Sequence, residues 1–116
     1  MIFSNPFSKS APNASPRDVG HDELQKALSD GAVTVVDVRE PHEFAGGHIP
    51  GAINLPLSRF KPEQIPAGKA PVLICQAGAR SATALRQAHA AGATHVRHYA
   101  GGMNGWRARG GEVVVP

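Results

Sequence analysis

Two short apolar runs most constrain what this 116-residue chain can fold into. AVTVVDV spans residues 32–38 and PVLIC spans residues 71–75, and both have the length and apolar character of strands. Helix-like segments lie before, between and after them, so strands alternate with helices. This alternation predicts an α/β domain with a small, mostly parallel sheet and helices on both faces. In such sheets ligands bind at the carboxyl ends of the strands.

The segments around these runs carry helix and turn signals. Leu24, Ala27 and Leu28 recur at helical spacing ahead of Gly31, which predicts a helix over HDELQKALSD. Similar patterns predict the remaining elements: short helices at 40–47 and within 57–66, an Ala-rich helix at 79–92, a strand at 94–99, and a short helix or turn at 101–111.

Length and composition predict one folded domain over residues 15–116, with residues 1–14, rich in Ser, Pro and Asn, as a flexible tail. No run of about 18 apolar residues occurs, so we expect no contact with a membrane. The N-terminus also lacks the basic region and continuous apolar stretch of a signal peptide. The single cysteine allows no internal disulfide, which favours a reducing, cytoplasmic location.

Charge is spread unevenly along the chain. Residues 1–74 carry 7 Lys and Arg against 8 Asp and Glu, whereas residues 75–116 carry 5 Arg against one Glu. The basic segment is either a plain solvated face or a field that attracts an anionic substrate. Nucleic acid is not an expected partner, because the chain has no dense Lys and Arg stripe and few aromatic residues.

The only cysteine lies in the stretch LICQAGARS, at the end of the second apolar run. A strand, a short loop and a helix beginning near Arg80 would direct backbone N–H groups and the positive end of the helix dipole toward sulfur. Gly78 permits unusual backbone angles, Arg80 supplies a forked cation, and Ser81 is predicted to cap the helix. Such a loop would activate Cys75 as a nucleophile. The alternative is the buried, inert thiol that most cysteines are.

CQAGARS resembles the active loop of rhodanese-type sulfurtransferases, C-x-x-G-x-R-S/T. Three further stretches are similar to other signatures of that family and follow in the same order: VVDVREPHEF, GHIPGAINLPL, and YAGGMNGW with the GGEVV after it. The resemblance covers about residues 15–116 and implies a single-domain rhodanese with the rhodanese-like fold.

The resemblance also implies a reaction. The Cys75 thiolate would take the outer sulfur of thiosulfate or of a persulfide donor, carry it as a persulfide, and pass it to cyanide or to a thiol acceptor, which could belong to a protein. This is covalent catalysis in two steps and needs neither a metal nor an organic cofactor. The donor and the persulfide would be bound by the loop that follows the cysteine: Gln76, Ala77, Gly78, Ala79, Arg80 and Ser81.

The length of the loop argues for sulfur rather than phosphate. Four residues separate Cys75 from Arg80, whereas the related phosphatases that share the rhodanese-like fold have five. The shorter ring of N–H groups suits a persulfide. Phosphatase or arsenate-reductase chemistry remains the minor alternative. The main alternative to a sulfurtransferase is a carrier that accepts a persulfide from a partner enzyme and has little activity on free thiosulfate. A non-catalytic interaction domain is less expected than this carrier.

Other chemistry-bearing residues are interpreted as structural. We expect Asp37 to be a buried carboxylate that accepts backbone hydrogen bonds, with Arg39 paired to an acid such as Glu43; a role near the active loop is the alternative. Met103 and Trp106 are expected to pack in the core or to wall the cysteine pocket.

The six histidines show no compact cluster with zinc spacing, so no metal site is expected. His48 is predicted to stabilise a turn. A histidine base for Cys75 is conceivable, but the loop could activate the thiol without one.

Overall fold

The structure is a computed structural model that describes residues 17–116. The predicted tail at 1–14 and the predicted start of the domain at residue 15 lie outside the described residues. Within 17–116, no helix is both long enough and apolar enough to cross a membrane.

Four parallel strands form one sheet in the order β2-β1-β3-β4. Their bounds are β1 Val33–Asp37, β2 Ile53–Asn54, β3 Ala70–Ile74 and β4 Arg97–His98. The two apolar runs of the sequence become the two central strands, in register from Val33 opposite Ala70 to Asp37 opposite Ile74. The predicted α/β class with a parallel sheet is confirmed.

The helices occupy the segments in which they were predicted. They are α1 His21–Ser29, α2 Pro41–Ala45, α3 Ala79–Ala90 and α4 Gly102–Ala108, with short 3-10 helices η2 Leu57–Arg59 and η3 Pro62–Gln64. The predicted strand at 94–99 is reduced to the two residues of β4, because residues 94 and 95 lie in a turn instead.

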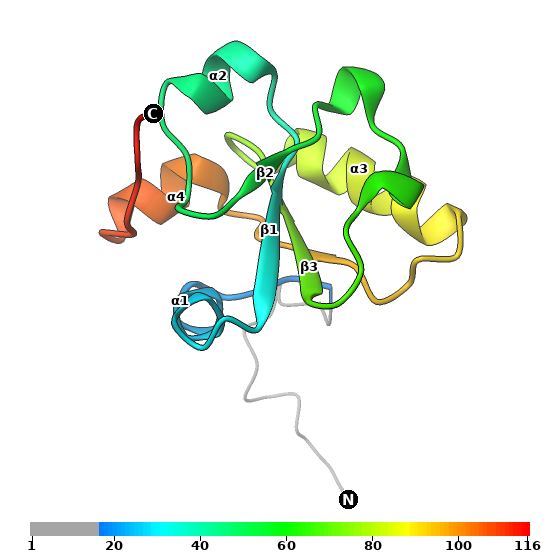
Figure 1. The fold of residues 1–116 in the computed structure, drawn as a ribbon, viewed down its shortest axis with the longest axis horizontal. Helices are drawn as coiled ribbons and strands as arrows, with labels where there is room; N and C mark the ends of the chain where they lie inside the picture. Colours follow the sequence, from blue (N-terminus) through cyan, green and yellow to red (C-terminus); the bar gives the residue numbers. More distant parts are fainter. Residues whose placement is uncertain (1–16) are drawn as a thin grey trace, which may run out of the picture.

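The sheet is covered on both faces (Figure 1). On one face α1 and α4 bury Leu24, Met103 and Trp106 in a core with Val35 and Ile74. On the other face the core contains residues of α3 and alternate residues of the central strands: Ala84, Leu85, Ala88, Val36 and Leu73. Burial on both faces explains why these strands read as continuous apolar runs rather than as alternating patterns.

The carboxyl ends of β1 and β3 lie side by side, since the Val38 N–H donates to the Ile74 carbonyl oxygen at 2.9 Å. The segment after β3 therefore starts beside the segment that leads from β1 to α2. Cys75, the first residue after β3, lies at this carboxyl end of the sheet.

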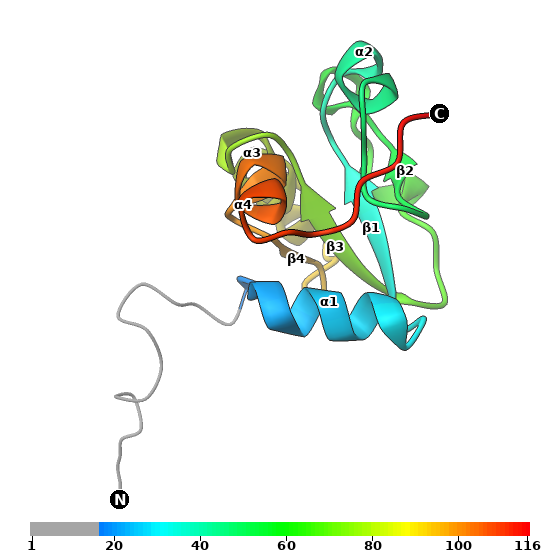
Figure 2. The ribbon, with the colours of Figure 1, turned by 90° about the vertical axis from the view of Figure 1, so that its left-hand side faces the viewer.

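The C-terminal segment runs beside the segment that follows α2 (Figure 2), where His48 and Val114 exchange two backbone hydrogen bonds of 2.9 Å.

Candidate active site around Cys75

The cysteine loop is a tight connection between β3 and α3. Cys75 directly follows β3, and α3 begins at Ala79 with Gly78 as the residue that precedes it. Gly78 has φ of 105°, in the left-handed region, and a Cβ there would overlap the Ala100 carbonyl oxygen. Two features therefore require a glycine at residue 78: its left-handed backbone angle, and the close approach of the Ala100 carbonyl oxygen.

The segment that leads into α4 closes the loop from the other side. The Met103 N–H donates to the Cys75 carbonyl oxygen at 2.8 Å, and the Asn104 N–H donates to that of Gln76 at 3.1 Å. Gly102 has φ of 65°, and a Cβ there would overlap the Gln76 carbonyl group. The stretch YAGGMNGW thus holds the cysteine loop through backbone contacts.

The sulfur atom receives hydrogen bonds from its own loop. The Gly78 N–H donates to Cys75 Sγ at 3.1 Å, and Ser81 Oγ lies 3.6 Å from the sulfur. Burial raises the pKa of the Cys75 thiol, but hydrogen bonds from the Ser81 hydroxyl and from the N–H groups of Ser81, Gly78 and Ala77 outweigh burial, so the net pKa lies below its ordinary value. The loop therefore favours the thiolate.

Access to the sulfur is narrow. Cys75 is only 1% exposed, while Ala77 and Ala79 are exposed and leave the rim of the loop free of bulky groups. Gln76 contributes a side chain to the rim, where its Nε2 donates to Asn104 Oδ1 at 2.6 Å. The sulfur is therefore almost completely covered, and the residues that border it on the surface side are small.

The prediction that Ser81 caps α3 is wrong. Gly78 is the capping residue, and Ser81 is the third residue of the helix, completely buried against the sulfur. Its hydroxyl reaches the Gly78 carbonyl oxygen at 3.2 Å and Nδ1 of His98 at 3.0 Å. Because α3 begins at Ala79, two residues before Ser81, the Ser81 side chain turns inward and contacts Cys75 instead.

Arg80 is held by an acid from α2. Its Nη1 and Nη2 donate to Glu43 Oε1 and Oε2 at 2.7 and 3.0 Å. The hydrogen bond from Arg80 holds the pKa of Glu43 down at about 2, and the carboxylate in turn raises the pKa of Arg80. The expected pairing of Arg39 with Glu43 is therefore wrong, because the two oxygens of Glu43 bind the active-loop arginine.

Arg39 pairs instead with Asp37, two residues before it. The Asp37 carboxylate is fully buried and accepts the Arg39 backbone N–H at 3.0 Å, as predicted for a structural carboxylate. It also accepts Arg39 Nη2 at 2.8 Å. The same guanidinium donates to the Gly47 carbonyl oxygen at 2.7 Å and to Gln76 Oε1 at 3.2 Å. The Arg39 side chain thus connects Asp37 to Gln76 of the cysteine loop through hydrogen bonds.

Most of the remaining candidate residues have packing roles. Met103 and Trp106 are buried, as predicted, and Trp106 Nε1 donates to the Glu112 carbonyl oxygen at 2.8 Å. His48 Nδ1 lies 2.9 Å from the Phe44 carbonyl oxygen, and its ring stacks on that of Phe44, in agreement with a turn-stabilising role. Among residues 17–116, no three His, Cys, Asp or Glu residues cluster closely enough to hold a metal ion.

Sequence reasoning missed His98 and Asp18. The sequence left open a histidine base for Cys75 without naming the histidine. In the structure His98 Nδ1 lies 3.0 Å from Ser81 Oγ and His98 Nε2 lies 3.0 Å from Asp18 Oδ1. The sequence does place His98 on a predicted strand that could lie next to the strand ending at Cys75. The register of β4 beside β3, which pairs His98 with Leu73, is needed to show that His98 reaches the cysteine loop.

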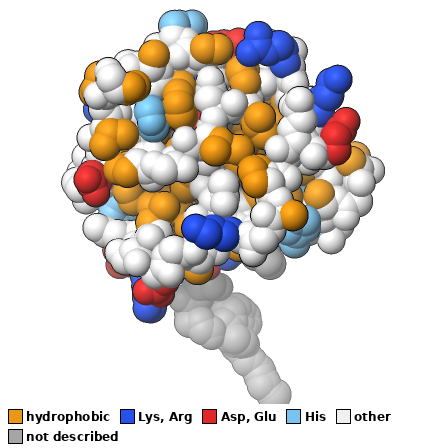
Figure 3. All heavy atoms as spheres, viewed as in Figure 1, with side chains coloured by type: hydrophobic (Ala, Val, Ile, Leu, Met, Phe, Trp, Pro, Cys, Tyr) orange, Lys and Arg blue, Asp and Glu red, His pale blue; other side chains and the backbone are white. Residues whose placement is uncertain are grey.

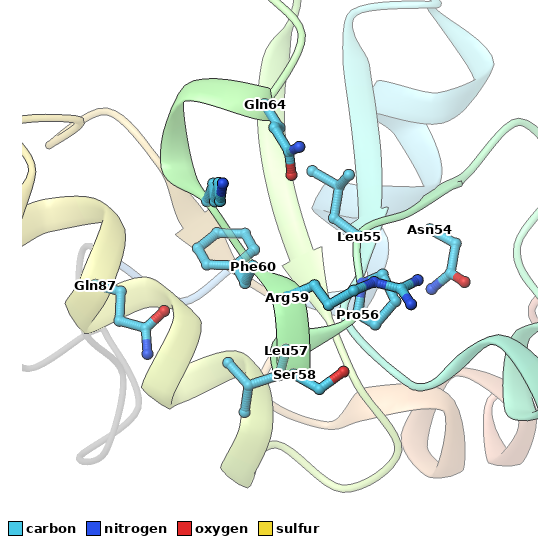
Figure 4. A pocket seen from close by; sticks show the side chains of 10 residues that line it. Asn54, Leu55, Pro56, Leu57, Ser58, Arg59, Phe60, Gln64 and Gln87 are labelled. Carbon is cyan, nitrogen blue, oxygen red and sulfur yellow. The ribbon is translucent and has the colours of Figure 1, made fainter.

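A cavity among the described residues lies away from this loop. It measures about 690 Å³ and is open to solvent beside η2 (Figure 4), lined by Asn54, Leu55, Pro56, Leu57, Ser58, Arg59, Phe60, Lys61, Gln64 and Gln87. No residue of the cysteine loop borders it. On the face drawn in Figure 3, Lys and Arg side chains lie in scattered groups rather than in one stripe.

Fold and loop together define a parallel α/β domain with a cysteine-centred loop at the carboxyl end of its sheet. The family model for the rhodanese-like domain matches residues 20–109. The chain belongs to the rhodanese-like domain family, as its motifs predicted.

Curated relatives include proteins named for sulfur transfer. A sulfurtransferase of Allochromatium vinosum is 33% identical over 85% of this chain and 95% of its own length. The human thiosulfate:glutathione sulfurtransferase is 32% identical over 72% of this chain and 87% of its own. A putative sulfur carrier protein of Bacillus subtilis is 32% identical over 71% of this chain and 45% of its own.

Other relatives are longer than the matched region. An uncharacterized protein of Synechocystis sp. is 47% identical over 75% of this chain, which spans half of the length of that relative.

Solved structures agree with the fold. A rhodanese-related protein of Thermoplasma volcanium has a TM-score of 0.76 at 32% identity, covering 86% of this chain and 99% of its own. The human single-domain sulfurtransferase has a TM-score of 0.70 at 31% identity, covering 82% of this chain and 98% of its own.

Proposed function

We propose that this protein is a sulfurtransferase that carries sulfane sulfur on Cys75. The observation that carries the proposal is the hydrogen bond of 3.1 Å from the Gly78 N–H to Cys75 Sγ, in a loop that lowers the pKa of the thiol. Sulfurtransferases among the relatives support the same chemistry. We take residues 15–116 as its single domain, and a reactive free thiol suits the reducing cytoplasm.

The reaction would proceed in two displacements. The Cys75 thiolate attacks the outer sulfur of thiosulfate, a new S–S bond forms, and the S–S bond of the donor breaks so that sulfite leaves with its electron pair. The product is a Cys75 persulfide anion. A thiolate acceptor then attacks the outer sulfur, and the Cys75 thiolate leaves in its original state.

The loop would stabilise the anions of both steps. The persulfide extends one atom beyond Sγ, toward the opening bordered by the exposed Ala77 and Ala79. Preorganised N–H groups of residues 76–81 would hold it without moving, which is the efficient form of electrostatic stabilisation. Arg80 and Gln76 would border the donor. Because Glu43 neutralises Arg80, we assign the attraction of the donor mainly to the backbone N–H groups.

A persulfide carrier is the second candidate. It is supported by the 32% identity with a protein named as a putative sulfur carrier. In that role Cys75 would accept sulfur from a partner enzyme and deliver it to a thiol acceptor, with slow turnover of free thiosulfate. The loop chemistry is the same, and only the source of the sulfur differs.

Steady-state transfer from thiosulfate to glutathione or cyanide tests the proposal. We expect turnover by the native protein and none by Cys75→Ser, with an unchanged unfolding curve for the variant. Retained activity in Cys75→Ser would contradict the role of Cys75. Slow turnover combined with fast loading from a protein persulfide would identify the carrier.

A further inference from the structure

A chain of short polar contacts leads from the buried thiol to the surface. Ser81 Oγ lies 3.6 Å from Cys75 Sγ, His98 Nδ1 lies 3.0 Å from Ser81 Oγ, and Asp18 Oδ1 lies 3.0 Å from His98 Nε2. Cys75 and Ser81 are at most 1% exposed and His98 is 7% exposed. The Asp18 side chain, at 33% exposure, reaches solvent.

Backbone pairing fixes the outer end of this chain. The His98 N–H donates to the Arg17 carbonyl oxygen and the Val19 N–H donates to the His98 carbonyl oxygen, both at 2.9 Å. Residues 17–19 therefore run beside β4 like a short extra strand, with Asp18 opposite His98. The carboxylate is held against the imidazole by the fold and not by a mobile side chain alone.

The contacts allow two complete proton arrangements. An ionised Asp18 only accepts hydrogen bonds, so Nε2 of His98 must carry a proton. In the neutral arrangement Nδ1 accepts from the Ser81 hydroxyl, whose oxygen accepts from the Cys75 thiol. In the charged arrangement Nδ1–H donates to the Ser81 oxygen, and the Ser81 hydroxyl donates to the Cys75 thiolate. The three contacts from Cys75 through Ser81 and His98 to Asp18 are satisfied in both arrangements.

We propose that Ser81 and His98 form a proton relay that converts the Cys75 thiol into a thiolate paired with a His98 imidazolium, with Asp18 orienting the ring. The Cys75 S–H bond breaks as an O–H bond forms at Ser81. The original Ser81 O–H bond breaks as an N–H bond forms at His98 Nδ1. No proton leaves the chain and the net charge does not change. His98 and Asp18 are thus positioning residues, which act on the sulfur through Ser81.

The charged surroundings favour the ion pair. On the histidine side, the Asp18 carboxylate lies 3.0 Å from Nε2 of His98, and the neighbouring Arg97 is paired with Glu23 at 2.7 Å.

On the sulfur side, the Gly78 N–H donates to Sγ, and Arg80 is neutralised by Glu43. The Gly78 carbonyl oxygen, 3.2 Å from Ser81 Oγ, is the competing acceptor for the hydroxyl proton and lies farther away than His98 Nδ1. An imidazolium two short contacts from the sulfur would therefore add to the stabilisation that the loop already gives.

The relay deepens the proposed function, because the same thiolate would attack the sulfur donor, but it can be measured without any sulfur transfer. The test is the pH dependence of Cys75 alkylation by iodoacetamide in the native protein and in His98→Gln. Glutamine can donate and accept hydrogen bonds but cannot take up the proton. His95→Gln, at an exposed histidine of the same segment, is the matched control.

We expect His98→Gln to move the midpoint of the alkylation profile upward by about one pH unit or more, with alkylation at pH 6 slowed about tenfold. His95→Gln should follow the native profile. Asp18→Asn, at the more exposed end, should shift the midpoint in the same direction by a smaller amount. A His98→Gln profile that superimposes on the native one, with an unchanged unfolding curve, would overturn the relay.

A second measurement needs no substitution. The ring-nitrogen NMR signals of His98 should report two ring protons at pH 7 and the loss of one when Cys75 is alkylated. A singly protonated ring before alkylation would overturn the relay even if the variants do not fold. If thiosulfate loads Cys75 but His98→Gln leaves the alkylation profile unshifted, the relay is refuted and the sulfurtransferase proposal stands. If His98→Gln shifts the profile but no sulfur donor loads Cys75, the relay stands and the sulfurtransferase proposal is refuted.

Discussion

The backbone N–H of Gly78 lies 3.1 Å from the sulfur of Cys75, and the left-handed backbone of this glycine places it there. No side chain can be added at residue 78 without meeting the Ala100 carbonyl oxygen. The electrostatics of the thiol and the packing of the loop against the segment that leads to α4 therefore depend on one residue.

Gly78→Ala should damage both stability and thiol reactivity. The left-handed angle costs an L residue about 1–2 kcal/mol, and the overlap with Ala100 adds to this, so we expect the free energy of unfolding to fall by about 3 kcal/mol. Gly92→Ala is the control, because Gly92 has a similar φ of 95° but open space around the added Cβ.

Urea unfolding and alkylation rates check this prediction. Gly92→Ala should lose about 1 kcal/mol and keep native alkylation rates, whereas Gly78→Ala should also slow alkylation at neutral pH. Equal losses of stability in the two variants would show that the contact with Ala100 does not constrain the loop.

The pairing of Arg80 with Glu43 should make stability depend on acid. The pKa of Glu43 is lowered to about 2 in the folded protein, below its unfolded value of about 4.3. The stabilisation is therefore complete above the unfolded pKa and is lost as the pH falls through the folded one. Since both side chains are partly exposed, we expect a contribution of about 1 kcal/mol.

Glu43→Gln isolates this contribution, because the side-chain oxygen of glutamine can still accept the hydrogen bond from the Glu40 backbone N–H. That hydrogen bond is part of the capping box at the N-terminus of α2. The difference in unfolding free energy between the native protein and the variant should be constant above about pH 5 and should shrink toward pH 2. A difference that does not change with pH would contradict the ion pair.

Arg39 should matter for stability more than any surface arginine. Arg39→Met leaves the fully buried carboxylate of Asp37 without its cation, and we expect a loss of about 3–5 kcal/mol. Arg59→Met, at an exposed arginine, should change stability by less than about 0.5 kcal/mol.

Chemical denaturation of the double variant completes the test. Adding Asp37→Asn to Arg39→Met removes the uncompensated charge, so the double variant should be more stable than Arg39→Met alone. Additive losses from the two substitutions would mean that the residues do not act as a pair.

The fold followed from local patterns in the sequence. The runs at 32–38 and 71–75 form the two central strands of the sheet. Continuous apolar runs of this kind are typical of the interior strands of a parallel sheet, because such strands are buried on both faces. Gly78 and the loop at 75–81 were singled out from the strand, loop and helix pattern around the only cysteine and from the resemblance of CQAGARS to the rhodanese loop. Of the two roles expected for Met103 and Trp106, packing in the core is confirmed by their burial.

Side-chain pairing could not be predicted in the same way. Glu43 was assigned to Arg39, but the ion pairs depend on which segments meet at the carboxyl end of the sheet. The contact of His98 with Ser81 depends likewise on the register of β4 beside β3, which a two-residue strand does not encode in its own sequence. Ser81 was misread as a cap because the helix begins at Ala79, two residues before it.

Intact-protein mass spectrometry after treatment with thiosulfate tests the central claim most directly. We predict that the native protein gains the mass of one sulfur atom, that fragmentation places it on Cys75, and that cyanide or a thiol removes it. Cys75→Ser should gain nothing. A native protein that stays at its original mass with thiosulfate and with persulfide donors alike would contradict the account.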